Sequence, residues 1–255
     1  MNRQKANEIR AGVLQGAGVA LLVLALAAPV VWWTRAAAPK APSASPPATA
    51  PATLARSADF GDADAPADVR TVAGWAVASR DHGASSFAVI DKRRTHLYVF
   101  DAQGRLSGNT PVLLGYASGD DSVPGIGQRP IDQVQPLERT TPAGRFDAGS
   151  GRNLLNEDVI WVDYEAAVSM HRVRATDPRE RRLERLATPT TADNRISYGC
   201  VNVPVAFFDS VVWPALGGHH VVVYVLPEVK TLDQVFPQAA SWAASRLAKA
   251  PVPLV

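Results

Sequence analysis

The chain is nearly devoid of cysteine: Cys200 is the only one among 255 residues. A single thiol cannot form an internal disulfide and rarely holds a metal unaided, so Cys200 is either a small buried hydrophobe or a nucleophile. The sequence also lacks a Walker motif, a dinucleotide-binding glycine motif and a CxxC pair. Its formal net charge of +2 lacks the basic excess of a nucleic-acid binder.

The first 35 residues contain an uncharged, apolar run over residues 11–34 that follows several basic residues ending at Arg10. About 20 apolar residues suffice to cross a bilayer as a helix, and the basic flank would stay in the cytoplasm. A cleavable signal peptide is the alternative, because Ala36-Ala37-Ala38 resembles a small-residue cleavage site. Residues 1–35 are thus predicted to be a membrane anchor or a signal segment, with the rest of the chain exported.

Beyond this segment, the composition divides the chain into three parts. Ala, Pro, Ser and Thr dominate residues 36–67, and such a segment cannot bury enough apolar surface to fold. We therefore predict a largely disordered linker over residues 36–84, one mainly β domain with a few short helices over residues 85–227, and a helical tail over residues 228–255.

The β prediction rests on short runs of β-prone residues separated by turn residues. Helices are expected where Asp177 caps Pro178, over residues 204–216, and in the tail, where Thr231 and Gln234 form a capping box. The predicted strands are residues 87–91, 95–100, 111–116, a strand fed by the turn 141–146, 159–164, 167–171 and 220–226.

Nucleophilic attack by a cysteine needs a thiolate, a base that exchanges its proton, and N–H donors for the oxyanion. His171 is the best candidate base, because it ends a β-prone run from which the chain makes one excursion and returns to Cys200. Gly199, directly before the cysteine, suits a tight turn that aims a reactive group.

These residues carry a resemblance to a known family. The stretch Ser197-Tyr198-Gly199-Cys200-Val201-Asn202, preceded by His171, is similar to the signature of the L,D-transpeptidase catalytic domain. Thr141-Pro142-Ala143-Gly144-Arg145-Phe146 looks like that family's Thr-Pro-x-Gly-x-Phe turn. The predicted strands at 87–100 and 219–225 resemble its first hairpin and its closing strand.

The resemblance covers more than half of the chain and implies a β-sandwich or barrel-like domain. It further implies that Cys200 is acylated by a peptidoglycan tetrapeptide stem, which links the enzyme to cell-wall cross-linking and remodelling in the periplasm. His171 would be the base, its ring held by a backbone carbonyl, and no cofactor or metal would take part. The remaining site residues would form the oxyanion hole or shape the site: Ser197, Tyr198, Gly199, Asn202 and Arg172.

Two departures from the family pattern leave alternatives open. Tyr198 stands where the family usually has histidine, and residues 174–187 form an Arg-rich insert between His171 and Cys200. The insert is either a lid whose arginines meet substrate carboxylates or a solvated helix face. Hydrolysis of the same thioester would give an L,D-carboxypeptidase or endopeptidase, and a protein amine is a third acceptor. A catalytically silent peptidoglycan-binding module is the alternative outside enzymes.

Overall fold

The computed structural model of the chain describes residues 57–249. The predicted anchor over residues 1–35 and the linker up to residue 56 lie outside this range. From residue 57 to residue 249, none of the helices combines the length and the apolar character needed to span a bilayer.

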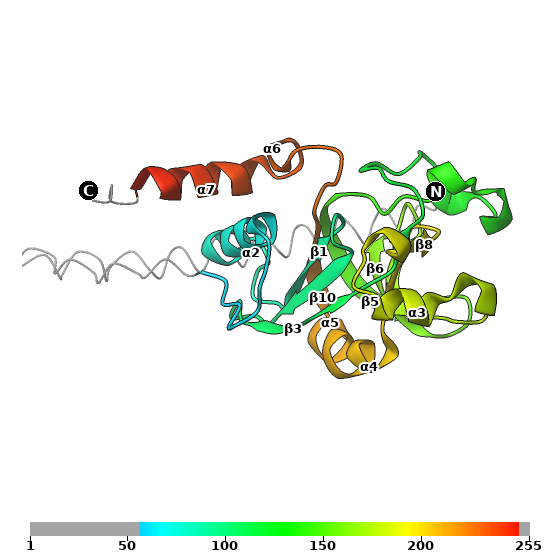
Figure 1. The fold of residues 1–255 in the computed structure, drawn as a ribbon. Helices are drawn as coiled ribbons and strands as arrows, with labels where there is room; N and C mark the ends of the chain where they lie inside the picture. Colours follow the sequence, from blue (N-terminus) through cyan, green and yellow to red (C-terminus); the bar gives the residue numbers. More distant parts are fainter. Residues whose placement is uncertain (1–56, 250–255) are drawn as a thin grey trace, which may run out of the picture. The chain divides into compact units, whose positions relative to one another are not determined.

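A mixed sheet forms the centre of the fold (Figure 1). It has eight strands in the order β3-β2-β1-β10-β5-β6-β7-β9. The sheet is nearly closed, because Asn202 in β9 exchanges backbone hydrogen bonds of 3.0 and 2.8 Å with Leu113, just beyond β3. A separate pair joins β4 and β8. The strands are β1 (Phe87–Asp91), β2 (His96–Phe100), β3 (Leu106–Pro111), β4 (Leu114–Gly115), β5 (Gly144–Arg152), β6 (Asp158–Asp163), β7 (Val168–Arg172), β8 (Arg195–Ser197), β9 (Val201–Val203) and β10 (His220–Val225).

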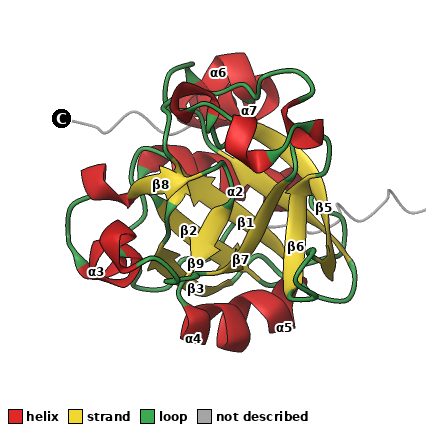
Figure 2. Cartoon of the chain, turned by 90° about the vertical axis from the view of Figure 1, so that its right-hand side faces the viewer, coloured by secondary structure: helices red, strands yellow, loops and turns green. Residues whose placement is uncertain are grey.

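Helices cover the two faces of this sheet (Figure 2). On one face, Phe208, Val212 and Leu216 pack into the larger core cluster with the inward residues of the strands. Their spacing of four keeps them on one side of a helical segment. That segment comprises α4 (Val205–Phe207), a π-helical turn (Phe208–Val212) and α5 (Trp213–Leu216).

The other face is covered by α2 (Ala67–Ser79) together with α6 (Leu232–Val235) and α7 (Pro237–Lys249). Strand β1 is buried along its whole length because both faces of the sheet are covered there. Trp242 of α7 lies directly on Gly74 of α2, where an added Cβ would be only 2.7 Å from the indole ring.

Most predicted elements are confirmed. The hairpin β1–β2, strands β6, β7 and β10, and the helical segment 205–216 lie where the sequence predicts them. The described part of the predicted tail contains helices α6 and α7, and the capping box between Thr231 and Gln234 is present.

Three predictions need correction. The linker predicted over 36–84 is too long, because residues 67–79 form α2 and bury its apolar side chains. The strand predicted over 111–116 is replaced by β3 and the short β4. The helix predicted from Asp177 is broken at Arg181, whose φ of +50° separates a single 3-10 turn (Pro178–Glu180) from α3 (Arg182–Ala187).

A buried ionic cluster fixes the loop before β5 to the segment after β10. The Lys92 side chain is fully buried, and its Nζ lies 2.8 Å from Asp120 Oδ1 and 3.3 Å from Glu228 Oε1. Asp120 also accepts hydrogen bonds from the backbone amides of Glu228, Val229 and Lys230. These bonds and the Lys92 charge overcome the effect of burial and lower the pKa of Asp120 to about 2.

Candidate active site

The parallel pairing of β7 with β9 brings His171 and Cys200 together. His171 is in register with Asn202, and Cys200 lies directly before β9. The sheet therefore aligns two residues that are separated in the chain by the Arg-rich insert.

Cys200 is held in a tight turn by hydrogen bonds of its neighbours. Ser197 Oγ donates to the Cys200 carbonyl at 2.6 Å and accepts from the Gly199 amide at 3.1 Å. Gly199 has a φ of +126°, and an added Cβ would lie 2.9 Å from the carbonyl oxygen of Thr140. This position therefore requires glycine both for its backbone conformation and for the close approach of Thr140. Thr141 Oγ1 fixes the turn from the other side by donating to the Gly199 carbonyl at 2.7 Å.

The half-buried sulfur of Cys200 faces β7. The Ser169 amide lies 3.5 Å from Sγ, the Ser169 hydroxyl 3.7 Å, and the Ala167 carbonyl 3.7 Å. Burial would raise the pKa of the Cys200 thiol, but the neighbouring charge of His171, with the donors of Ser169, lowers it below its ordinary value. The surroundings thus favour the thiolate, which is the nucleophilic form.

The His171 ring has one determined orientation. Its Nδ1 lies 2.7 Å from the carbonyl oxygen of Arg172. A carbonyl can only accept, so Nδ1 carries the proton of the neutral ring and Nε2 is left to exchange protons with the thiol. Burial would lower the pKa of His171, but the neighbouring Cys200 thiolate and the hydrogen bond to the Arg172 carbonyl raise it.

Asn202 links the pair to the Arg-rich insert. Its Oδ1 accepts a hydrogen bond from the Arg182 guanidinium, so its amide nitrogen is turned toward the site. Nδ2 lies 3.4 Å from His171 Nε2 and 3.3 Å from the carbonyl oxygen of Cys200. Asn202 is almost completely buried, and the orientation of its amide therefore depends on Arg182.

The side chain of Arg172 does not shape the cleft as the sequence analysis predicted. It points to the other side of the strand, where Nε donates to Asp209 at 2.7 Å and the guanidinium lies 4.5 Å from the Phe208 ring. Neighbouring residues of a strand alternate between its faces, so Arg172 must turn away when His171 faces the site. Only the Arg172 carbonyl belongs to the site.

Tyr198 packs against an arginine at the edge of the site. The Arg139 guanidinium lies 3.8 Å from the centre of the Tyr198 ring, and the tyrosine is 37% exposed.

The structure narrows the set of backbone amides that the sequence predicts as oxyanion donors. The Gly199 amide is engaged by Ser197, which leaves the amides of Tyr198 and Cys200 as candidates.

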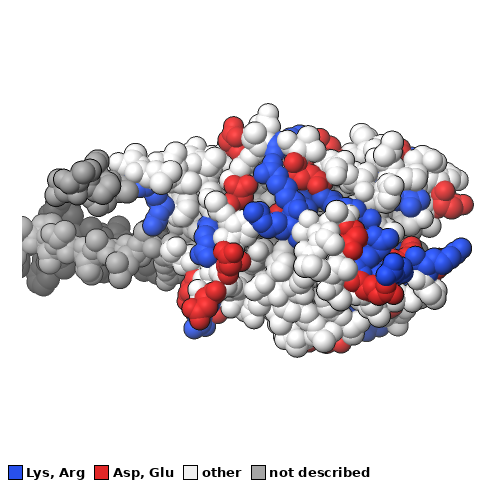
Figure 3. Space-filling model, viewed as in Figure 1, with Lys and Arg blue, Asp and Glu red and all other residues white. Residues whose placement is uncertain are grey.

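A cleft of about 270 Å³ opens beside the thiol, and its lining includes His171, Cys200, Asn202, Arg174 and Arg182. Charged side chains gather at the side of the molecule where α3 lies, as Figure 3 shows. The arginines of the insert divide into two groups. Arg182 and Arg185 turn inward to hydrogen-bond Asn202 and the Asp193 carbonyl, whereas Arg179 and Arg181 form solvent-exposed ion pairs.

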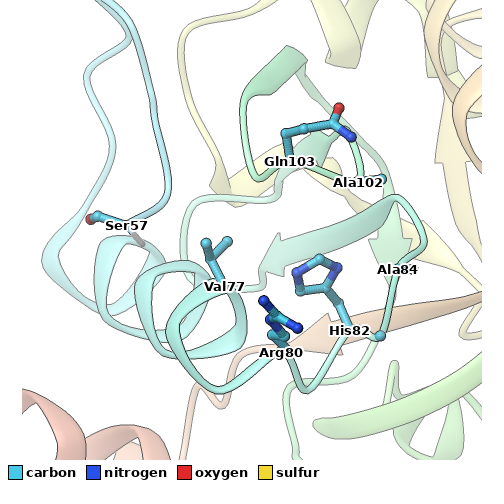
Figure 4. A pocket seen from close by; sticks show the side chains of 8 residues that line it. Ser57, Val77, Arg80, His82, Ala84, Ala102 and Gln103 are labelled. Atoms are coloured by element: carbon cyan, nitrogen blue, oxygen red, sulfur yellow. The ribbon is translucent and has the colours of Figure 1, made fainter. Parts of the chain in front are cut away.

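A larger cavity of about 630 Å³ lies away from Cys200, beside the end of α2 and the β2–β3 turn (Figure 4). Its lining includes Val77, Arg80, His82 and Gln103. The His82 ring packs against Phe87 and its Nδ1 bonds the Ser85 carbonyl at 2.8 Å. The residues that line this cavity include no thiol and no carboxylate to accompany His82. The candidate nucleophile Cys200 lies instead at the cleft of about 270 Å³.

Two contacts of the site are not evident in the sequence: that of Ser169 with the Cys200 sulfur and that of Arg182 with Asn202. Ser169 gives no signal in the sequence beyond its place two residues before His171. Arg182 belongs to the insert that the sequence analysis singled out, but nothing in the sequence distinguishes it from the neighbouring arginines.

No family model matches the chain, and no curated protein matches it. Among solved structures, it is similar to a variant of the helical cell shape determining protein Pgp2 from Campylobacter jejuni, with a TM-score of 0.38, 14% identity and 72% of this chain covered. The match spans 65% of the Pgp2 chain, just under two thirds of its length. An L,D-transpeptidase from Xylanimonas cellulosilytica gives a TM-score of 0.33 and 16% identity, covering 56% of this chain and 60% of that one. The catalytic domain of the E. faecium L,D-transpeptidase gives 0.31 and 16%, covering 57% and 99% of the two chains.

Proposed function

We propose that the chain is a cysteine-dependent L,D-transpeptidase that acts on peptidoglycan stem peptides through a thioester on Cys200. One observation carries the proposal: the Cys200 thiol and a His171 ring held by the Arg172 carbonyl lie together at the wall of an open cleft. The sequence signature around Cys200 supplies the substrate class. The site of action would be the cell envelope, with the domain held outside the cytoplasm by the N-terminal apolar run or released there after cleavage.

In the acylation step, the Cys200 thiolate attacks the carbonyl carbon of the amide bond that joins the third residue of the stem to its terminal D-alanine. The electron pair of the carbonyl moves to its oxygen, and the amides of Tyr198 and Cys200 would stabilise this oxyanion. As the tetrahedral intermediate collapses, the C–N bond breaks and His171 Nε2–H protonates the leaving amine. D-Alanine departs, and a thioester on Cys200 remains.

In the second step, the amine of another stem attacks the thioester. His171 Nε2 accepts the proton of this amine, the C–S bond breaks, and the thiolate returns to its starting state. Water in place of the amine would give a tripeptide, which is the outcome of an L,D-carboxypeptidase. The carbonyl-held histidine serves both steps because its ring stays oriented while its protonation changes.

The test incubates the full-length protein with a disaccharide-tetrapeptide and reads products and protein by intact mass. We expect a cross-linked dimer and released D-alanine with the wild type, and neither with Cys200→Ala. Cys200→Ser is the matched control, because it keeps the shape of the side chain but replaces the thiol with a far weaker nucleophile.

Tripeptide without dimer would replace the transpeptidase with the carboxypeptidase. A folded wild-type protein that gives no product and forms no adduct with a carbapenem, which mimics the acyl donor, would overturn the enzymatic proposal and leave a peptidoglycan-binding module.

A further inference from the structure

A row of residues crosses the sheet and ends at the catalytic sulfur. The strand registers pair His220 with Gly149, Gly149 with Trp161, and Trp161 with Ser169. Directly paired residues share a face of the sheet, so the row runs over β10, β5, β6 and β7 on one face. Ser169 contacts Cys200 Sγ, which places the sulfur at the end of this row.

The sheet is hollowed along the row. A cavity of about 310 Å³, here called the Trp161 hollow, is lined by Asp147, Gly149, Trp161, Tyr164 and His220. Trp161 belongs to neither buried core cluster, because its neighbours Ile160 and Val162 take the core side of β6.

Gly149 opens the hollow, and Gly151 makes room for the Trp161 ring beside it. Gly149 forms its floor, and a Cβ there would meet no atom within 4 Å. Gly151 lies beneath the Trp161 ring, and a Cβ there would be 2.7 Å from the indole. Glycine weakens a strand interior and marks a place where another group approaches the backbone closely. At Gly151 that group is Trp161, whereas the space over Gly149 is left open.

The walls combine aromatic faces with exposed polar groups. Trp161 and Tyr164 meet edge to face with their ring centres 5.2 Å apart, and Tyr164 is 78% exposed. The Asp147 carboxylate is 58% exposed although it is paired with Arg145, and His220 is exposed at the opposite wall. A pyranose ring matches this chemistry, because its C–H face packs on an aromatic ring while its hydroxyls donate to a carboxylate.

We propose that the Trp161 hollow binds an N-acetylated amino-sugar ring of the glycan strand that carries the stem peptide. The choice of this ligand rests on the proposed function. The distances agree with it: Gly149 and Ser169 are two strand spacings apart, about 10 Å. Three stem residues separate the sugar from the scissile bond, and three extended residues reach about 10 Å. A sugar in the hollow would thus deliver its stem peptide to Cys200.

The experiment measures binding of a peptide-free tetramer of N-acetylglucosamine to the full-length Cys200→Ala protein by isothermal titration calorimetry. We expect saturable binding that Trp161→Ala weakens about tenfold, the worth of a stacked aromatic contact. Trp161→Phe keeps a ring and should lose less. Leu155→Ala, an exposed side chain on the neighbouring β5–β6 turn, is the matched control and should bind like its parent.

Gly149→Val tests the hollow without removing any group. Its side chain enters open space, and a β-branched residue suits a strand, so the melting temperature should be kept or raised. Glycan binding should be lost. Wild-type affinity in a folded Gly149→Val protein, or an absence of saturable binding in the parent, would overturn the proposal. If Gly149→Val does not fold, equal affinities of Trp161→Ala and its parent overturn it instead.

Turnover separates this proposal from the proposed function. In the Cys200-containing protein, Trp161→Ala should lower kcat/KM for the disaccharide-tetrapeptide about tenfold more than it lowers kcat/KM for the free tetrapeptide, which has no sugar to place in the hollow. Glycan binding without turnover by the wild type would support the hollow and reject the enzyme. Turnover without glycan binding would support the enzyme and reject the hollow.

Discussion

The contact of Arg182 with Asn202 predicts how a residue of the insert controls the protonation of His171, the proposed base. Asn202 Oδ1 accepts from Arg182, so its Nδ2–H group faces His171 Nε2 at 3.4 Å. This orientation suits a neutral ring, whose Nε2 accepts, and opposes the imidazolium, whose Nε2–H would meet another donor. Arg182→Ala frees the amide to reverse, so that Oδ1 accepts from the imidazolium. The pKa of His171 should therefore rise.

The size of this rise in the pKa of His171 follows from the hydrogen bond that the reversed Asn202 amide would make to the imidazolium. A hydrogen bond to a charged group contributes about 1.5–3 kcal/mol net, and one pKa unit corresponds to about 1.4 kcal/mol. Part of this free energy is lost in turning the buried amide of Asn202, so the pKa of His171 should rise by about one unit. Removing the Arg182 charge acts in the same direction, because a nearby cation disfavours the imidazolium.

The assay measures the pKa of His171 by NMR as a function of pH in a Cys200→Ser background, which removes the thiol whose titration would be coupled to that of the ring. Arg179→Ala is the matched control, because the Arg179 side chain is 90% exposed and is paired with Asp177 of the same insert. His171→Gln assigns the signal. The reasoning fails if Arg182→Ala and Arg179→Ala give the same pKa, or if Arg182→Ala lowers it.

Two further predictions concern the framework around the site. Asp120→Asn leaves the fully buried Lys92 without its closest partner and should cost about 3–5 kcal/mol in urea unfolding at pH 7. The pKa of Asp120 is lowered to about 2. The contribution of its carboxylate to the free energy of unfolding is therefore fully present above about pH 4, the ordinary pKa of an aspartate, and is lost as the pH falls toward 2. The difference in free energy of unfolding between Asp120→Asn and the wild type should shrink from about pH 4 to about pH 2. A cost below about 1 kcal/mol at pH 7 would contradict a stabilising role of the buried cluster. Gly199→Ala forces a Cβ against the Thr140 carbonyl and should slow iodoacetamide modification of Cys200 at least tenfold, about 1.4 kcal/mol of activation free energy; a wild-type rate would show that the turn can relax.

Elements with strong local signals were predictable from the sequence. The alternation in 95–100 with its flanking turns predicts the β1–β2 hairpin, and Thr231 with Gln234 predicts a helix start that the structure contains. The proximity of His171 and Cys200 could be predicted because a cysteine nucleophile needs a nearby base, and because the sequence motif contains a histidine followed by the cysteine stretch.

Other features depend on tertiary packing and have no local signal. Residues 67–79 resemble the Ala-rich linker in composition, but α2 is stabilised by the sheet and by Trp242 of α7. Strand β3 contains few β-prone residues and is held by its pairing with β2. The direction of Arg172 and the bond from Arg182 to Asn202 follow from the sheet's faces and from the path of the insert, neither of which a linear pattern specifies.

The position of β10 in the sheet has a consequence for folding. It lies between β1 and β5, so it joins two blocks that are each built from near neighbours in the chain. One block is β1–β2–β3, and the other, β5–β6–β7–β9, carries Cys200. Pairing β10 with β1 connects Phe87 to Val222, and such distant pairing slows folding because a long loop must close first. Until β10 inserts, both blocks present unpaired strand edges, the kind of surface that invites aggregation. Insertion of this one strand therefore ends the period in which these two edges expose the nascent chain to misassembly.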